Sequence, residues 1–272
     1  MSFNKQEIAD LILAKLKSNK VDLEKQFLAS KNAIGYFFID DLLPEELAVE
    51  IYQKFPNITE SVKRKSLREF KFTAFQMNKF NPLLEEVIYA FQDERIVNLV
   101  SNICEIEQVF PDTNLYAGGL SLMTKNNFLN PHLDNSHDKD RNRWRVLNLL
   151  YYVTPDWKLE NGGNLELWPT GLEDKQLTIE SKFNRLVVMV THQKSWHSVS
   201  KVLVDNVRCC VSNYYFSQEP LLASDTFHVT TFRGRPEEKF KDLLLQFDSK
   251  LRSSVRKLFK KGVRENPHQY KK

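Results

Sequence analysis

The chain has 272 residues, of which 42% are hydrophobic and 27% charged, a composition typical of a globular protein and unlike that of a disordered one. A net charge of +4 is too small to indicate nucleic-acid binding, and no stretch approaches the roughly 20 apolar residues that cross a membrane. Three cysteines, two of them adjacent, do not suggest a disulfide framework, and the charged N-terminus lacks the apolar region of a secretory signal, so a cytoplasmic protein is expected.

The first 110 residues predict a mostly helical support region. Apolar residues at helical spacing predict a helix over 6–16, and the apolar run 36–39 predicts a short buried strand. Another helix is expected to begin near Pro44, which is followed by two glutamates suited to a first turn. A helical block over 82–104 is expected to be divided in two by Asp93, a favourable N-cap residue.

After Pro111 the pattern changes to short runs rich in valine, leucine, tyrosine and tryptophan, separated by turn residues. The five clearest runs are 120–123, 146–153, 164–168, 186–190 and 209–216. Short strands at this spacing are typical of a β-sandwich or jelly roll. We therefore expect an α+β protein whose catalytic or binding core is formed by residues 111–218.

Residues 219–272 predict a C-terminal helical extension. The helix is expected over 235–261, with Gly262 as its stop. Its apolar stripe consists of Phe240, Leu244, Phe247, Leu251, Val255 and Leu258. We expect this stripe to pack on the β core of the same compact unit. The near-heptad spacing leaves open the alternative that it pairs with a second copy in a homodimer.

The first motif with chemical content is His132-Leu133-Asp134. On an extended strand, residues two apart face the same side, so His132 and Asp134 can present an imidazole nitrogen and a carboxylate oxygen to one point. Such an N,O pair suits Fe(II). Alone the motif is weak, because the same triplet can be simply a polar strand end.

A second histidine in the right place would complete a metal site. His197 lies 65 positions after His132, so the chain must return across the sheet to bring them together. Two histidines and one carboxylate form the facial triad of non-haem Fe(II) oxygenases, which leaves positions open for other ligands. His192 lies in the same short segment and is the alternative third ligand. The apolar alternation after His197 favours His197.

Strand 208–216 and strand 145–153 offer groups for an anionic ligand. An arginine pointing into an apolar barrel needs an anionic partner, and the guanidinium of Arg208 suits a carboxylate such as that of 2-oxoglutarate. Tyr152 and Asn148 share one face of the neighbouring strand and could assist. The alternatives are an arginine at the rim paired with a protein acid, and a tyrosine used for packing.

Taken together, these pieces resemble the prolyl 4-hydroxylase-like branch of the 2-oxoglutarate/Fe(II)-dependent oxygenases, including the hypoxia-inducible-factor prolyl hydroxylases and their bacterial relatives. The resemblance runs from about residue 120 to residue 216. Its motifs are HLDN (132–135), LLYYVTPDW (149–157), GGNLELWPTG (162–171), FNRLVVM (183–189), HSV (197–199), and Arg208 ahead of YYF (214–216).

The resemblance implies a double-stranded β-helix, or jelly-roll, core with N-terminal supporting helices. It implies iron at His132, Asp134 and His197, and 2-oxoglutarate held by Arg208 with help from Tyr152 and Asn148. The reaction implied is hydroxylation of an unactivated C–H bond with O₂ as cosubstrate and ascorbate as a stimulant. A prolyl residue is the first substrate expected, and a small metabolite, free amino acid or glycan is the alternative. A protein of another class, a non-catalytic jelly roll that binds a metal or ligand, would keep the same residues.

Overall fold

The computed structural model describes residues 3–258 and 269–270. Its helices are α1 (Lys5–Ser18), α2 (Lys20–Ser30), α3 (Glu45–Gln53), α4 (Pro82–Ala90), α5 (Glu94–Ile103) and α6 (Lys239–Leu258). Its strands are β1 (Tyr36–Ile39), β2 (Val62–Lys65), β3 (Glu69–Ala74), β4 (Val109–Pro111), β5 (Gly119–Met123), β6 (Phe128–Leu133), β7 (Trp144–Tyr152), β8 (Leu165–Leu167), β9 (Leu177–Ile179), β10 (Arg185–Val190), β11 (His197–Val199), β12 (Arg208–Ser217) and β13 (Thr231–Phe232). No helix in these residues has both the length and the apolar character needed to cross a bilayer.

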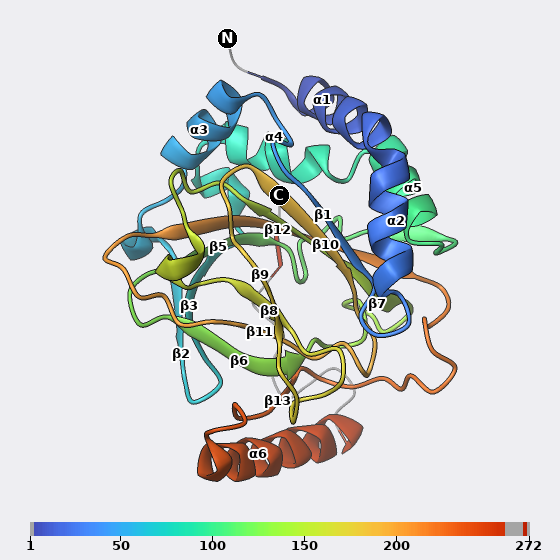
Figure 1. The fold of residues 1–272 in the computed structure, drawn as a ribbon, viewed down its shortest axis with the longest axis vertical. Coiled ribbons are helices and arrows are strands. Elements are labelled where there is room, and N and C mark those ends of the chain that lie inside the picture. Colours follow the sequence, from blue (N-terminus) through green and yellow to red (C-terminus); the bar gives the residue numbers. More distant parts are fainter. Residues whose placement is uncertain (1–2, 259–268, 271–272) are drawn as a thin grey trace.

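The strands form one curled antiparallel sheet in the order β1-β10-β7-β12-β5-β3-β6-β11-β8-β9, with β13 beside β6, β2 beside β3 and β4 beside β12. Figure 1 shows α1 to α5 gathered at one end of this sheet and α6 at the opposite end. The expected jelly-roll fold with N-terminal helices and a C-terminal helix is confirmed. The sheet also contains strands from outside the expected core at 111–218, namely β1, β2, β3 and β13. The division of the chain at residues 110 and 218 stays a prediction.

The central strands are buried on both sides. Every residue of β10 is buried, and β12 is buried except at Tyr214. The main core joins these strands to α1, α4 and α5, which explains why the strand sequences read as nearly continuous apolar runs. The helix boundary expected at Asp93 is confirmed, because its carboxylate accepts a hydrogen bond from the backbone N–H of Arg95 at the start of α5.

The flanking segments contain one element that was not expected and one expectation that is wrong. Residues 62–74 form the hairpin β2–β3 within the region expected to be mostly helical. The apolar stripe of α6 does not pack on the core: Phe240 and Phe247 are 76% and 70% exposed, and among the described side chains of this helix, 239–255, only Leu245 and Ser249 are buried. Gly262 and the side chain of Leu258 lie outside the described residues.

Candidate metal and cosubstrate site

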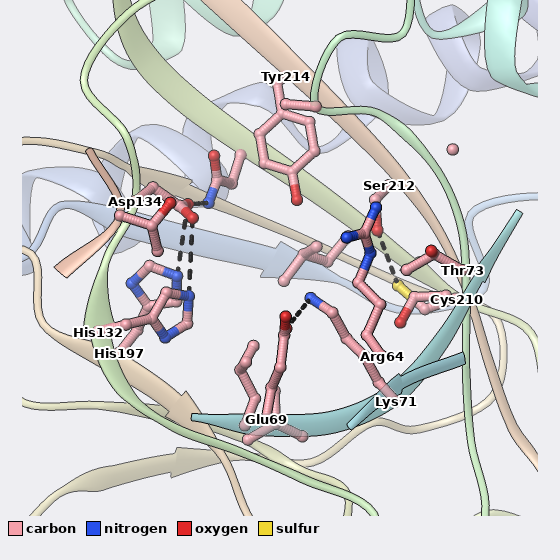
Figure 2. A pocket seen from close by; sticks show the side chains of 18 of the residues that line it. Arg64, Glu69, Lys71, Thr73, His132, Asp134, His197, Cys210, Ser212 and Tyr214 are labelled. Carbon is pink, nitrogen blue, oxygen red and sulfur yellow. Dashed lines mark hydrogen bonds and ion pairs between the residues drawn. The ribbon is translucent and has the colours of Figure 1, made fainter. Parts of the chain in front are cut away.

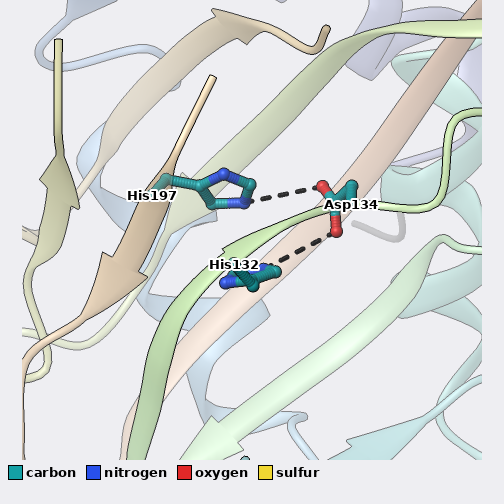
Figure 3. A group of neighbouring side chains, drawn as sticks. All are labelled: His132, Asp134 and His197. Carbon is teal, nitrogen blue, oxygen red and sulfur yellow. Dashed lines mark ion pairs between the residues drawn. The ribbon is translucent and has the colours of Figure 1, made fainter. Parts of the chain in front are cut away.

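The strand register brings the two separated histidines together. In the antiparallel pair β6–β11, His132 and His197 lie directly opposite each other, and their ring centroids are 4.1 Å apart. Asp134 follows immediately after β6, with its carboxylate 3.6 Å from Nε2 of His132 and 3.5 Å from Nε2 of His197. Figure 3 shows both rings directed at this carboxylate. One ligand atom from each of the three side chains lies within 4.8 Å of the other two.

The hydrogen bonds of the imidazole rings determine which nitrogens are free for a metal. Nδ1 of His132 is 3.0 Å from the carbonyl of Asn130, and Nδ1 of His197 is 2.9 Å from the carbonyl of Ser195. A carbonyl can only accept, so each Nδ1 carries the proton and each Nε2 is left with its lone pair. Burial and the neighbouring His197 lower the pKa of His132, which keeps this ring neutral.

Asp134 is held as a carboxylate. Burial raises its pKa, but the charge of Arg145 and the two histidines outweigh that effect and hold the pKa well below its usual range. The side-chain amide of Asn148 donates to Oδ2 at 2.7 Å, and Arg145 lies 3.2 Å from the same oxygen. Two lone pairs and a carboxylate facing one point are the donor set of a divalent cation, so the residues present fit Fe(II).

The alternative ligand His192 lies elsewhere. It is half-buried, and its Nδ1 accepts a hydrogen bond from the backbone N–H of Lys194. It is absent from the residues that line the cavity around His132 and Asp134. The geometry therefore brings His197, and not His192, to the other two side chains.

Arg208 lies at the start of β12, in the wall of the same cavity. It is 3% exposed, its Nε has no acceptor, and no carboxylate of the described residues forms an ion pair with it. The guanidinium carbon lies 5.3 Å from the centre of the Tyr152 ring. A buried cation without a partner is costly, so this group requires an anion from outside the chain.

Tyr152 and Asn148 both line the cavity, as expected for residues on one face of β7. The hydroxyl of Tyr152 is buried near Arg208 and Ser181, without a hydrogen bond of good geometry to either. This leaves it available to a ligand at Arg208. Asn148 instead donates to Asp134, and its carbonyl oxygen is buried without a partner. Its role as a contact of the cosubstrate stays a prediction.

A cavity of about 420 Å³ connects these groups. Figure 2 shows the triad on one side of it and residues of the β2–β3 hairpin on another. Sequence reasoning missed Arg145 and the hairpin residues Arg64, Glu69, Lys71 and Thr73, all of which line the cavity. A usable signal was present, because residues 69, 71 and 73 alternate with the apolar-facing positions 70, 72 and 74.

The comparisons with known proteins agree with this arrangement. Residues 118–216 match the family model of the 2OG-Fe(II) oxygenase superfamily. No curated protein matches the sequence significantly. The matched segment contains all six residues predicted for the metal and cosubstrate site: His132, Asp134, Asn148, Tyr152, His197 and Arg208.

Several solved structures share the fold. A prolyl hydroxylase from Trichoplax adhaerens, in complex with a hypoxia-inducible-factor peptide, has a TM-score of 0.54 at 19% identity, covering 75% of this chain and 92% of that one. A prolyl 4-hydroxylase from Pseudomonas putida has a TM-score of 0.54 at 14% identity, covering 72% and 100%. One from Phytophthora capsici has a TM-score of 0.57 at 17% identity, covering 95% and 79%. The family match and the shared fold lead to one conclusion: residues 118–216 match the 2OG-Fe(II) oxygenase superfamily, and the chain has the fold of solved prolyl hydroxylases.

Proposed function

We propose that this protein is a 2-oxoglutarate-dependent dioxygenase that hydroxylates an unactivated C–H bond. One observation carries the proposal: a metal-binding triad and a buried arginine without a partner face the same cavity. His132, Asp134 and His197 would hold Fe(II), and Arg208 would bind the far carboxylate of 2-oxoglutarate through its planar guanidinium. The hydroxyl of Tyr152 is positioned to donate to that carboxylate.

Iron with 2-oxoglutarate and O₂ would supply an oxidant strong enough to attack an aliphatic C–H bond, with release of succinate and CO₂. The chain's own residues prepare the site for this chemistry. Carbonyl groups fix the tautomer of each histidine, and Asn148 and Arg145 orient the carboxylate of Asp134. The two imidazole rings and the side chains of Asn148 and Arg145 are buried, which limits their contact with bulk water.

The first substrate to test is a prolyl residue in a peptide, because the chain shares its fold with prolyl hydroxylases. Small metabolites, free amino acids and glycans are the alternative substrates. The rival of another class is a jelly roll that binds a metal and a ligand without turnover. Both classes predict metal binding, and only the enzyme predicts succinate formation.

The test is succinate formation by purified protein with Fe(II), 2-oxoglutarate, O₂ and candidate substrates. The cytoplasmic location expected from the sequence would keep iron reduced, and ascorbate is expected to prolong turnover in the assay by the same effect. Asp134→Ala is expected to abolish substrate-dependent succinate formation and to weaken metal binding, because it removes the only carboxylate of the triad. The matched control is Asp140→Ala, an exposed carboxylate in the following loop.

Wild-type activity in the Asp134→Ala variant would contradict the assignment of the site. Protein that binds Fe(II) and 2-oxoglutarate but forms no succinate with any substrate class would support the binding-protein alternative.

A further inference from the structure

The hairpin β2–β3 presents charged side chains to the cavity. Arg64 lies opposite Lys71 in the antiparallel register, so both point to the same face. Alternation along β3 adds Glu69 and Thr73 to that face, and all four residues line the cavity. Figure 2 shows the side chains of Arg64 and Lys71 rising from the hairpin into the cavity.

The two neighbours of Arg64 along β2 point to the opposite face of the hairpin. Lys63 and Lys65 are exposed and lie over the ring of Phe70 on the other side of the hairpin. Arg64 is half-buried. The position of Arg64 therefore follows from strand alternation and distinguishes it from the two solvated lysines beside it.

The positive charges of the cavity wall can be accounted for one by one. Arg145 is paired with Asp134, and Lys71 with Glu69 at 3.1 Å. Arg68 and Arg252 are both paired with Asp248 of α6. Among the cationic residues of the wall, only Arg208 and Arg64 form no ion pair with any described residue.

The two arginines differ in how strongly they require an anion. Arg208 is buried, and the proposed function assigns a carboxylate of 2-oxoglutarate to it. Arg64 is half-buried and interacts electrostatically with Glu69 without a direct ion pair, so its guanidinium can still bind an anionic group of the substrate that enters the cavity with 2-oxoglutarate. A half-buried guanidinium prefers a planar, bidentate partner such as a carboxylate or phosphate.

Thr73 supplies an independent indication of a ligand. It is 8% exposed, lines the cavity, and its hydroxyl has no hydrogen-bond partner among the described residues. It lies diagonally across the hairpin from Arg64, at a separation of about 7–8 Å between backbones. One oxygen-bearing group can therefore reach both the guanidinium and the hydroxyl.

We propose that the substrate is a small molecule carrying a carboxylate or phosphate group, which Arg64 binds with help from Thr73. This proposal rests on the proposed function and narrows its substrate class. A cavity of about 420 Å³ that must also hold 2-oxoglutarate suits a small molecule. Arg68 and Arg252, which also line the cavity, are held by Asp248 of α6.

The first test uses inorganic phosphate as the probe and needs no known substrate. Protein loaded with Mn(II), to prevent turnover, and saturated with 2-oxoglutarate is titrated with phosphate by calorimetry at constant ionic strength. Binding is expected in the wild type and at least about tenfold weaker in Arg64→Met, with an intermediate value for Arg64→Lys. Lys63→Met, the exposed neighbour, serves as the matched control and is expected to match the wild type.

The second test compares substrates by succinate formation. Free amino acids and phosphate esters supply the two kinds of anion, and a prolyl peptide with both termini blocked supplies an uncharged competitor. Arg64→Met is expected to raise the KM for the anionic substrate about tenfold or more, because a half-buried guanidinium partner is removed, while the KM for 2-oxoglutarate stays unchanged.

The outcomes distinguish the role of Arg64 from the proposed dioxygenase function. If phosphate binds wild type and Arg64→Met equally, or binds neither, the proposal is overturned. A wild type that turns over the blocked peptide faster than any anionic compound also overturns it, yet leaves the dioxygenase function intact. Absence of succinate from every substrate contradicts the proposed function, while phosphate binding still decides the role of Arg64.

Discussion

The two walls of the cavity differ in how their polar groups are held. On the wall built by β6, β7, β11 and β12, the side chains of the triad are fixed by buried partners: carbonyl groups for the histidines, and Asn148 and Arg145 for Asp134. On the wall built by β2 and β3, the Lys71–Glu69 pair is partly exposed and Arg64 has no ion-pair partner. The first wall is organised for a metal before any ligand arrives, and the second wall is left open for a ligand.

The same two walls differ in their relation to the family. The first lies within residues 118–216, which match the oxygenase family model, and the hairpin at 62–74 lies outside them. The residues suited to the reaction and those suited to choosing a substrate therefore come from separate parts of the chain. Mutations in the two walls are expected to change different kinetic constants.

The largest effect that distinguishes the walls is expected from Arg208→Met. Loss of a buried guanidinium should raise the KM for 2-oxoglutarate about 100-fold or more, because its carboxylate partner is left unpaired. Arg208→Lys keeps the charge but loses the bidentate geometry and should give a smaller increase. Steady-state kinetics with each cosubstrate varied in turn checks this. If Arg208→Met instead affects only the primary substrate, the roles assigned to Arg208 and Arg64 are exchanged.

A smaller effect is expected from Asn148→Ala, on the metal rather than on 2-oxoglutarate. The amide of Asn148 donates to Asp134 at 2.7 Å, and loss of such a supporting hydrogen bond typically weakens metal affinity about 10- to 100-fold. Competition with a chelator measures the change, and Asn98→Ala, on the exposed face of α5, is the control. A raised KM for 2-oxoglutarate with unchanged metal affinity would favour the sequence-based role of Asn148 as a cosubstrate contact.

The smallest effect is expected from the helix behind the hairpin wall. Phe247 of α6 is 70% exposed, so Phe247→Ala should change the free energy of unfolding by less than about 0.5 kcal/mol. Leu245→Ala, at a position 2% exposed, should lower it by about 2–3 kcal/mol. Urea denaturation at several protein concentrations measures both. If Phe247→Ala instead lowered the free energy of unfolding strongly, and by an amount that depends on protein concentration, a second copy of the chain would cover the stripe, as the homodimer alternative predicts.

Secondary structure and the facing of side chains could be predicted from the sequence where apolar periodicity and local chemistry act together. Strand alternation puts Arg208, Cys210, Ser212 and Tyr214 on one face of β12, and all four line the cavity. The cap at Asp93 and the helices on either side of it followed from a favourable N-cap residue and helical spacing. These features depend on neighbours within a few residues, which a sequence displays directly.

The hairpin β2–β3 was missed although Phe70, Phe72 and Ala74 alternate with polar residues along β3. Its cavity face carries Arg64, Glu69 and Lys71, so the alternation alone does not tell that the polar face is the one turned inward. The contact between Asn148 and Asp134 joins two strands and cannot be read from either alone. For α6, periodicity identifies an apolar stripe but not the surface, if any, that covers it.

Phe232 on β13 extends the surroundings of the proposed metal site beyond the segment that matches the family model. Its ring stacks on the imidazole of His132 at 5.2 Å, and Ser249 of α6 hydrogen-bonds to its backbone. A fragment cut at residue 216, where the family match stops, would lose Phe232 and uncover one flank of that imidazole. A fragment meant to keep the proposed metal site in its present surroundings therefore has to extend through β13 and as far as Ser249 of α6.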